Sequence, residues 1–193
     1  KSEVLLHSPG HVKHDGHNLT GFIIFLCSES IIFFAFFIGY GVLKITAPTW
    51  YPDGVSGIAV REPLINTIIL VSSSFVIYFA EKYLHNKNYW GFRLVWLVTM
   101  LMGSYFVYGQ YVEWSELTFS LSSGVFGGLF YLLTGFHGLH VITGILLMGL
   151  MLIRSFIPGN YDKGEMGVES ISLFWHFVDV IWIILFILIY VWQ

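Results

Sequence analysis

Five ionisable side chains lie inside stretches of the sequence that are otherwise apolar enough to cross a membrane: Glu29, His137, His140, His176 and Asp179. An Asp at the centre of a membrane helix costs about 2.5 to 3.5 kcal/mol on insertion scales, so such groups persist where protein or water provides a partner. His176 and Asp179 are three residues apart and share one face of a helix. A neighbouring helix is therefore expected to present a polar group to that face.

Glu29 lies near the middle of its apolar stretch, directly after Cys27 and Ser28. One interpretation is a proton relay or an ion site, since intramembrane carboxyls often mark such pathways. The other is a structural carboxyl that is protonated and hydrogen-bonded to neighbouring Ser or His side chains. A lone carboxyl does not make a pathway, so the sequence favours the structural role.

The three intramembrane histidines raise the possibility of a haem or a metal site. His137 and His140 are three residues apart on one helix and point the same way, so they cannot take opposite axial positions of one haem. A bis-histidine haem would need His176 as its second ligand. The favoured alternative is a hydrogen-bonded pair of His140 and Asp179, which fall at similar depths in consecutive spans.

Other polar groups lie outside the apolar stretches or at their ends. The N-terminal segment has four histidines at spacings of four, three and three: His7, His11, His14 and His17. This spacing suits zinc on a helix, but glycines at positions 10 and 16 favour a solvated tail. Gln110, Glu113 and Glu116 are predicted to form an ordinary polar cap. The sequence contains no phosphate-binding loop, nucleophile elbow, HExxH or thiol motif.

The composition is that of an integral membrane protein. Of the 193 residues, 56% are hydrophobic and only 11% are charged, whereas a soluble domain averages about 25% charged residues. Five windows reach the length of about 20 residues that crosses a bilayer core: 19–43, 64–84, 90–111, 125–153 and 171–192. They predict an all-α fold, a bundle of five transmembrane helices over residues 19–193, after a polar His-rich tail over residues 1–18. Cys27 is the single cysteine, so no disulfide can form within the chain, and the net charge of −3 suggests no nucleic-acid partner.

The basic residues predict the orientation. Of the nine Lys and Arg residues, seven lie in the tail or flank the second and fourth loops, and only Lys44 and Arg61 flank the first loop. Positive charge gathers on the cytoplasmic side of membrane proteins. The N-terminus is therefore expected inside and, after five crossings, the C-terminus outside.

Small and aromatic residues suggest how the helices pack. Four glycines fall within a narrow arc of the fourth span and predict a groove for close helix approach: Gly124, Gly128, Gly135 and Gly138. Because His137 and His140 lie on the opposite face, this span is expected in the middle of the bundle. The serines at 72–74 are expected to form small, hydrogen-bonding contacts. The phenylalanines of 33–37 are expected to meet lipid or a partner subunit.

Three segments together resemble subunit III of the haem–copper respiratory oxidases. They are CSESIIF at 27–33, TGFHGLHVITG at 134–144 and FWHFVDVIW at 174–182, supported by PLINT at 63–67 and by the segment 110–114. Each motif is short, but the match is ordered along the chain and covers nearly all of it from residue 19 onward.

The resemblance implies an accessory subunit without haem or copper of its own. Such a subunit packs beside the catalytic subunit I, with subunit II and sometimes a small subunit IV in the same complex, and its helices hold phospholipid in a cleft. Glu29 matches the family's Glu in the first motif, which is proposed to lie near an oxygen entry route. The complex reduces O2 to water, pumps protons and holds the haem and copper in its partner subunits.

Two features leave alternatives open. Many family members have seven helices, and five resemble the shorter prokaryotic form, which suggests a plasma or thylakoid-type membrane rather than the mitochondrial inner membrane. The motifs look more like cytochrome c oxidases than quinol oxidases, although the donor docks on other subunits. Two more remote readings are a small transporter that uses Glu29 and Asp179 as coupling carboxylates, and a haem-b membrane anchor.

Overall fold

Five long apolar helices make up the fold in the computed structural model, which describes residues 15–55, 57–157, 159, 161 and 166–193, with side chains from residue 19 onward. In chain order they are α1 (Asp15–Thr46), α2 (Arg61–His85), α3 (Tyr89–Glu116), α4 (Gly124–Arg154) and α5 (Met166–Phe186), and α5 continues into a π-helical turn, η1 (Ile187–Val191). All five are long and apolar enough to span a membrane. The predicted five-helix transmembrane fold is therefore confirmed in the part of the chain that the structure describes.

The tail boundary differs from the predicted one. Helix α1 begins at Asp15, within the predicted tail of residues 1–18. Three of the tail histidines, His7, His11 and His14, lie outside the described residues, and the side chain of His17 does too. Both the favoured solvated tail and the alternative of a zinc site therefore stay untested predictions.

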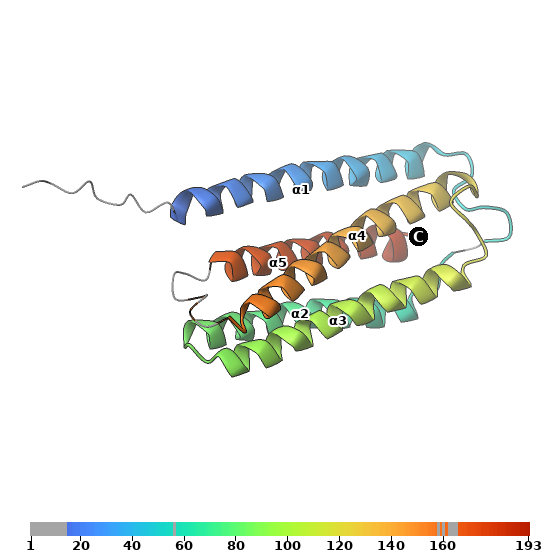
Figure 1. Ribbon diagram of the computed structural model, residues 1–193. Helices are drawn as coiled ribbons and strands as arrows, with labels where there is room; N and C mark the ends of the chain where they lie inside the picture. The colour runs from blue at the N-terminus through green and yellow to red at the C-terminus, as the bar shows by residue number, and fades with distance from the viewer. Residues whose placement is uncertain (1–14, 56, 158, 160, 162–165) are drawn as a thin grey trace, which may run out of the picture.

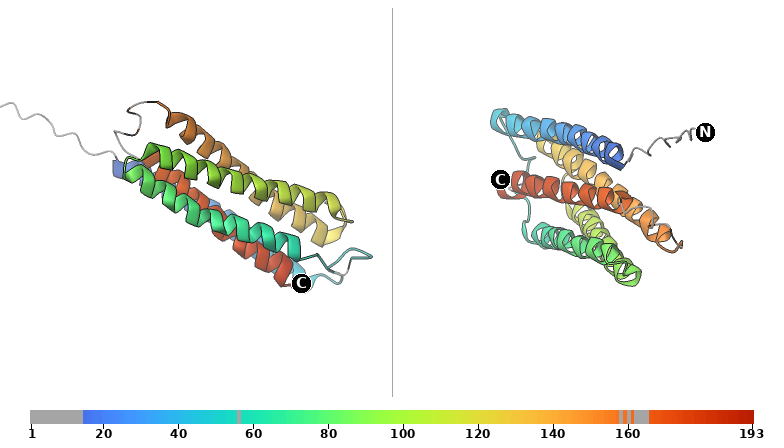
Figure 2. Two further views of the ribbon diagram at one scale, coloured as in Figure 1. Left: turned by 90° about the horizontal axis from the view of Figure 1, so that it is seen from below. Right: turned by 90° about the vertical axis from the view of Figure 1, so that its left-hand side faces the viewer.

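Helix α5 is the central element. It lies between α1 on one side and the α2–α3 pair on the other, and α4 crosses in front of it in the view of Figure 1 (Figures 1 and 2). In its most apolar window 56% of residues are buried, against 22% for α4 and 17% for α1. The prediction that the fourth span occupies the middle of the bundle is wrong, because the central position belongs to the fifth.

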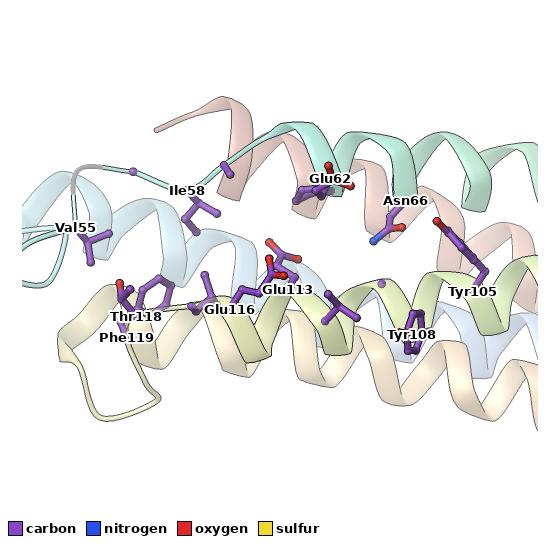
Figure 3. Close-up of a pocket in the computed structure, with 16 residues that line it drawn as sticks. Val55, Ile58, Glu62, Asn66, Tyr105, Tyr108, Glu113, Glu116, Thr118 and Phe119 are labelled. Carbon is purple, nitrogen blue, oxygen red and sulfur yellow. The ribbon is translucent and has the colours of Figure 1, made fainter.

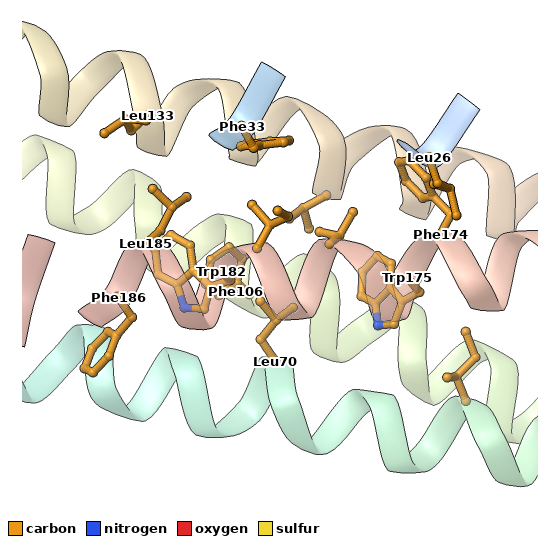
Figure 4. Close-up of a cluster of buried hydrophobic side chains, with 14 of the residues drawn as sticks. Leu26, Phe33, Leu70, Phe106, Leu133, Phe174, Trp175, Trp182, Leu185 and Phe186 are labelled. Carbon is orange, nitrogen blue, oxygen red and sulfur yellow. The ribbon is translucent and has the colours of Figure 1, made fainter. Parts of the chain in front are cut away.

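Two fully buried tryptophans on α5 anchor this arrangement. The Trp175 indole donates a hydrogen bond to Ser73 Oγ at 2.8 Å, and the Trp182 indole donates to Thr67 Oγ1 at 2.8 Å, so both tie α5 to α2. Phe106 of α3 packs edge-on against Trp182 with ring centroids 4.6 Å apart, and Figure 4 shows this cluster. Each indole thus fills the core and satisfies its N–H, which hydrocarbon could not do.

Helix α1 joins the bundle through one aromatic face. Phe33 and Phe37 are buried, and Phe33 packs on the rings of Phe136 in α4 and Phe177 in α5 at 5.2 and 6.2 Å. Phe34 points outward and is 54% exposed. The expectation that this phenylalanine run meets lipid or a partner is therefore wrong for Phe33 and Phe37, because their side of the helix faces α4 and α5.

The α4–α5 loop closes one end of the bundle. Arg93 of α3 donates to the Ser155 hydroxyl at 3.1 Å and to the Ser155 carbonyl, and its guanidinium stacks on Phe156. Tyr161 donates its hydroxyl hydrogen to the carbonyl of Met151 at 2.7 Å. The Met151 carbonyl also accepts a hydrogen bond from the backbone N–H of Ser155 at 3.0 Å, so Tyr161 adds a second donor there, whereas Arg93 supplies a donor to the Ser155 carbonyl beyond the end of α4.

Tyr161→Phe is expected to destabilise this end of the bundle by about 1 kcal/mol, since the hydrogen bond from the Tyr161 hydroxyl to the Met151 carbonyl is lost. Burial raises the pKa of the Tyr161 hydroxyl, partly offset by Arg154 and Arg93. A raised folded-state pKa stabilises the fold below the ordinary tyrosine pKa of about 10, and this contribution is lost as pH rises through the folded-state value. Unfolding followed from pH 8 to 12 should show a smaller alkaline loss of stability in the variant. An identical alkaline loss would contradict this role.

Candidate functional site

The most distinctive polar contact in the membrane layer joins α1 to α4. His140 Nε2 lies 3.1 Å from Glu29 Oε2, and the side chains are 14% and 19% exposed. Phe136 and Phe33 pack edge-on against the imidazole, with ring centroids 4.8 and 5.1 Å away. The pair therefore sits between two helices under an aromatic cover, close to the surface of the bundle.

The hydrogen bonds of His140 fix how the pair can hold its proton. His140 Nδ1 lies 2.8 Å from the carbonyl of Phe136, which can only accept, so Nδ1 carries a hydrogen. Nε2 then either accepts a hydrogen from a protonated Glu29 or, when protonated, donates to an ionised Glu29. In both arrangements the two side chains share one proton and carry no net charge, which suits a lipid environment.

The predicted pair of His140 and Asp179 is wrong. Asp179 is only 3% exposed and accepts a hydrogen bond from the Ser74 hydroxyl of α2 through Oδ2. His176 Nδ1 lies 3.0 Å from the same Ser74 oxygen, so one serine joins both α5 side chains to α2. His140 instead faces α1, and Asp179 faces α2. The expected polar partner of the His176–Asp179 face is thus Ser74.

The three intramembrane histidines lie at three different interfaces. His140 faces α1 and His176 faces α2, whereas His137 is fully buried between Phe106 of α3 and Trp182 of α5, with ring centroids 5.8 and 4.9 Å away. Neither ring nitrogen of His137 has a hydrogen-bond partner among the described residues. The fold therefore does not bring the three imidazoles together as a ligand set, and Glu29 and Asp179 also lie at separate interfaces.

Of the four glycines of the predicted groove, only Gly135 closely approaches another helix of this chain. A Cβ built at Gly124 or Gly138 would meet no atom within 4 Å, and one at Gly128 would meet only the Leu121 carbonyl at 3.6 Å. At Gly135 the nearest atom belongs to Trp114, at 3.2 Å. Gly135 and Gly138 instead line an apolar groove of about 410 Å³ between α3 and α4. The predicted helix contact is therefore wrong for Gly124, Gly128 and Gly138 within this chain.

The close approaches to Trp175 occur at two other glycines, Gly103 and Gly144. A Cβ at Gly103 of α3 would lie 2.5 Å from Trp175, and one at Gly144 of α4 would lie 2.9 Å from the same ring. These two glycines make the space in which the indole lies. A large ring on one span together with glycines on two others is the sequence feature that could indicate this packing. A single sequence does not show which ring meets which glycine.

The predicted polar cap at the far end of α3 is partly a buried network. Gln110 is 7% exposed and donates to Glu113 Oε2 at 2.7 Å, while the Tyr190 hydroxyl of η1 donates to Glu113 Oε1 at 2.8 Å. Glu116 is exposed, as the prediction had it. Glu113 therefore holds the C-terminal turn to α3, which an ordinary solvated cap would not do.

Comparison with known proteins identifies the family. Residues 7–193 match the family model described as cytochrome c oxidase subunit III. The chain belongs to this family. The cytochrome c oxidase subunit 3 of Synechocystis sp. is 41% identical over 94% of this chain and 78% of the relative, and that of Thermostichus vulcanus is 41% identical over 93% and 89%. The subunit 3 of Papio hamadryas is 36% identical over 93% of this chain and 74% of its own length.

Membership of the subunit III family confirms the resemblance seen in the sequence. Members of this family are subunits of cytochrome c oxidase, a haem–copper oxidoreductase complex, and the predicted function is confirmed at that level. The segments that carried the resemblance supply both membrane contacts described above. Glu29 and His140 come from the first two segments, and His176 and Asp179 come from the third.

Proposed function

We propose that this chain is the non-redox accessory subunit III of a proton-pumping haem–copper terminal oxidase. In this role it packs directly on subunit I, beside subunit II and in some complexes a small subunit IV, and stabilises subunit I through turnover. Haem and copper belong to the partner subunits, and this chain holds bound phospholipid between its helices. The membrane is a prokaryotic plasma or thylakoid-type membrane, in keeping with relatives from Synechocystis sp. and Thermostichus vulcanus.

The Glu29–His140 pair is the observation that carries this proposal. The Glu29 and His140 side chains form a pair with no net charge and need no third charged group, as expected of a structural contact. The pair fixes α1 to α4 at a partly exposed position, where a lipid or an oxygen route to the neighbouring subunit can pass beside it. An oxygen route needs no proton transfer from Glu29, so the proposal assigns the carboxyl no step in the redox chemistry.

The outer face of α1 supports direct packing on a partner. Four isoleucines recur every seven residues along it and are 65% to 76% exposed: Ile24, Ile31, Ile38 and Ile45. A seven-residue apolar repeat suits contact with another helix. Because α1 is the least buried helix of the five, a partner chain or lipid on this face would complete its packing.

The names of the relatives support cytochrome c rather than quinol as the electron donor of the complex. The experiment is purification of the complex from its native membrane, followed by separation of this chain. We expect one copy of this chain per haem–copper subunit and no Soret band in the separated chain. A Soret band that stays with this chain, or a chain that purifies alone, would contradict the proposal.

A further inference from the structure

A cavity of about 550 Å³ opens between α2 and α3 at the end of the bundle where α3 finishes. Three carboxylates line it, from Glu62, Glu113 and Glu116. Among the described residues that line it there is no Lys, Arg or His. Figure 3 shows Glu113 and Glu116 on α3 and Glu62 on α2, around one space. Such a cavity attracts cations and repels anions.

Asn66 gives this cavity a second, independent feature. Its side chain is 9% exposed, extends from α2 toward α3 (Figure 3), and makes no hydrogen bond with any described residue. Its amide lies against Gly109, where an added Cβ would collide with it. Its amide lines the cavity and no described residue bonds to it, so both its donors and its acceptor are available to a ligand there.

The shape of the cavity limits the ligand. Among the described residues, no three carboxylates or imidazoles are gathered closely enough to hold one metal ion, and the space is many times the roughly 30 Å³ that one water takes in the liquid. The cavity also runs along α3 from Glu116 to Tyr105, which is about 16 Å at 1.5 Å per residue. Tyr105 and Tyr108 line the cavity at the end farther from Glu116 and are exposed along the membrane-spanning part of α3.

We propose that this cavity binds the ammonium head of an amphiphile. The three N–H donors of an ammonium group match acceptors on the Asn66 amide and on the carboxylates. Glu113 is already held by Gln110 and Tyr190, so its position in the wall is fixed before the ligand binds. The alkyl part of the ligand lies along the Tyr105 and Tyr108 rings. Two sources share this chemistry, namely an ethanolamine phospholipid of the membrane and a free alkylamine.

The test uses the intact oxidase complex and native mass spectrometry, with decylammonium as the probe and decanol as the neutral probe of equal chain length. The wild-type complex should bind decylammonium at least about tenfold more tightly than decanol. Asn66→Leu, and separately Glu62→Gln with Glu116→Gln, should each weaken decylammonium binding about tenfold. The second variant changes only exposed carboxylates, so it keeps the test valid if Asn66→Leu fails to assemble.

The matched control removes two carboxylates at the opposite end of the bundle, Glu81→Gln with Glu169→Gln, and should leave decylammonium binding unchanged. The same spectra separate the sources: phosphatidylethanolamine retained by the wild type and lost in the cavity variants identifies a membrane lipid, whereas decylammonium binding without retained lipid identifies a free amine. Equal binding of decylammonium and decanol, or equal loss in the control and the cavity variants, would overturn the proposal.

Discussion

Gly103→Leu is expected to destabilise the bundle by about 3 kcal/mol or more, because overpacking of a well-filled core forces strained side chains and backbone shifts. Already the first carbon of a side chain at position 103 would lie 2.5 Å from the Trp175 ring, which is fully buried. The indole cannot move away, since Gly144 lies close to another edge of the ring and its N–H is bonded to Ser73. Thermal unfolding of the purified complex measures the effect.

Gly138→Leu is the matched control for this variant. The site on α4 has no atom within 4 Å of a built Cβ, and the adjacent groove of about 410 Å³ accommodates the rest of the side chain. The expected change in the free energy of unfolding is therefore less than about 1 kcal/mol. Equal losses at the two positions would show that the indole does not set the spacing of α3, α4 and α5.

Ser74→Ala is expected to cost about 2 to 3 kcal/mol, the penalty for leaving a buried polar group without a partner. Ser74 is the hydrogen-bond partner of both Asp179 and His176, and the other oxygen of Asp179 has none among the described residues. Adding Asp179→Leu to Ser74→Ala should recover much of the loss, since the unpaired carboxyl is then removed from the membrane. Unfolding of the two single variants and the double variant measures this coupling.

The neighbouring serine provides the control for that cycle. Ser72 donates its hydroxyl to the Ile68 carbonyl of its own helix at 2.6 Å, so Ser72→Ala should change stability by less than about 0.5 kcal/mol. A His140→Phe variant should add to Ser74→Ala without coupling, because the two residues lie at different interfaces. Strong coupling between His140→Phe and Ser74→Ala would contradict this separation of the two contacts.

The five helices were predictable because the sequence of each one is apolar over the length of a membrane span. A membrane helix must be about 20 apolar residues long, and charged or Pro- and Gly-containing loops separate such windows. The ends were less accurate: α3 extends to Glu116 and α5 begins at Met166, beyond the predicted 90–111 and 171–192. Polar residues in these outer turns lower the hydropathy without ending the helix.

The partners of the polar groups were not predictable in the same way. Spacing along one helix places His176 and Asp179 on one face, and the expected polar contact to that face exists. The sequence does not contain the rotation of each helix about its axis or the identity of its neighbour. His140 and Asp179 were therefore matched by depth although they face α1 and α2, and α4 was placed centrally although Trp175 and Trp182 make α5 the core.

Turnover of the assembled oxidase with Glu29→Gln tests most directly whether the Glu29–His140 pair is structural. A glutamine can donate its amide hydrogen to His140 Nε2, so it keeps a neutral contact between α1 and α4 but no longer shares a proton. We predict an initial rate of O2 reduction and a pumping ratio near those of the wild type, followed by faster loss of activity with successive turnovers. Loss of proton pumping from the first turnover would contradict this account.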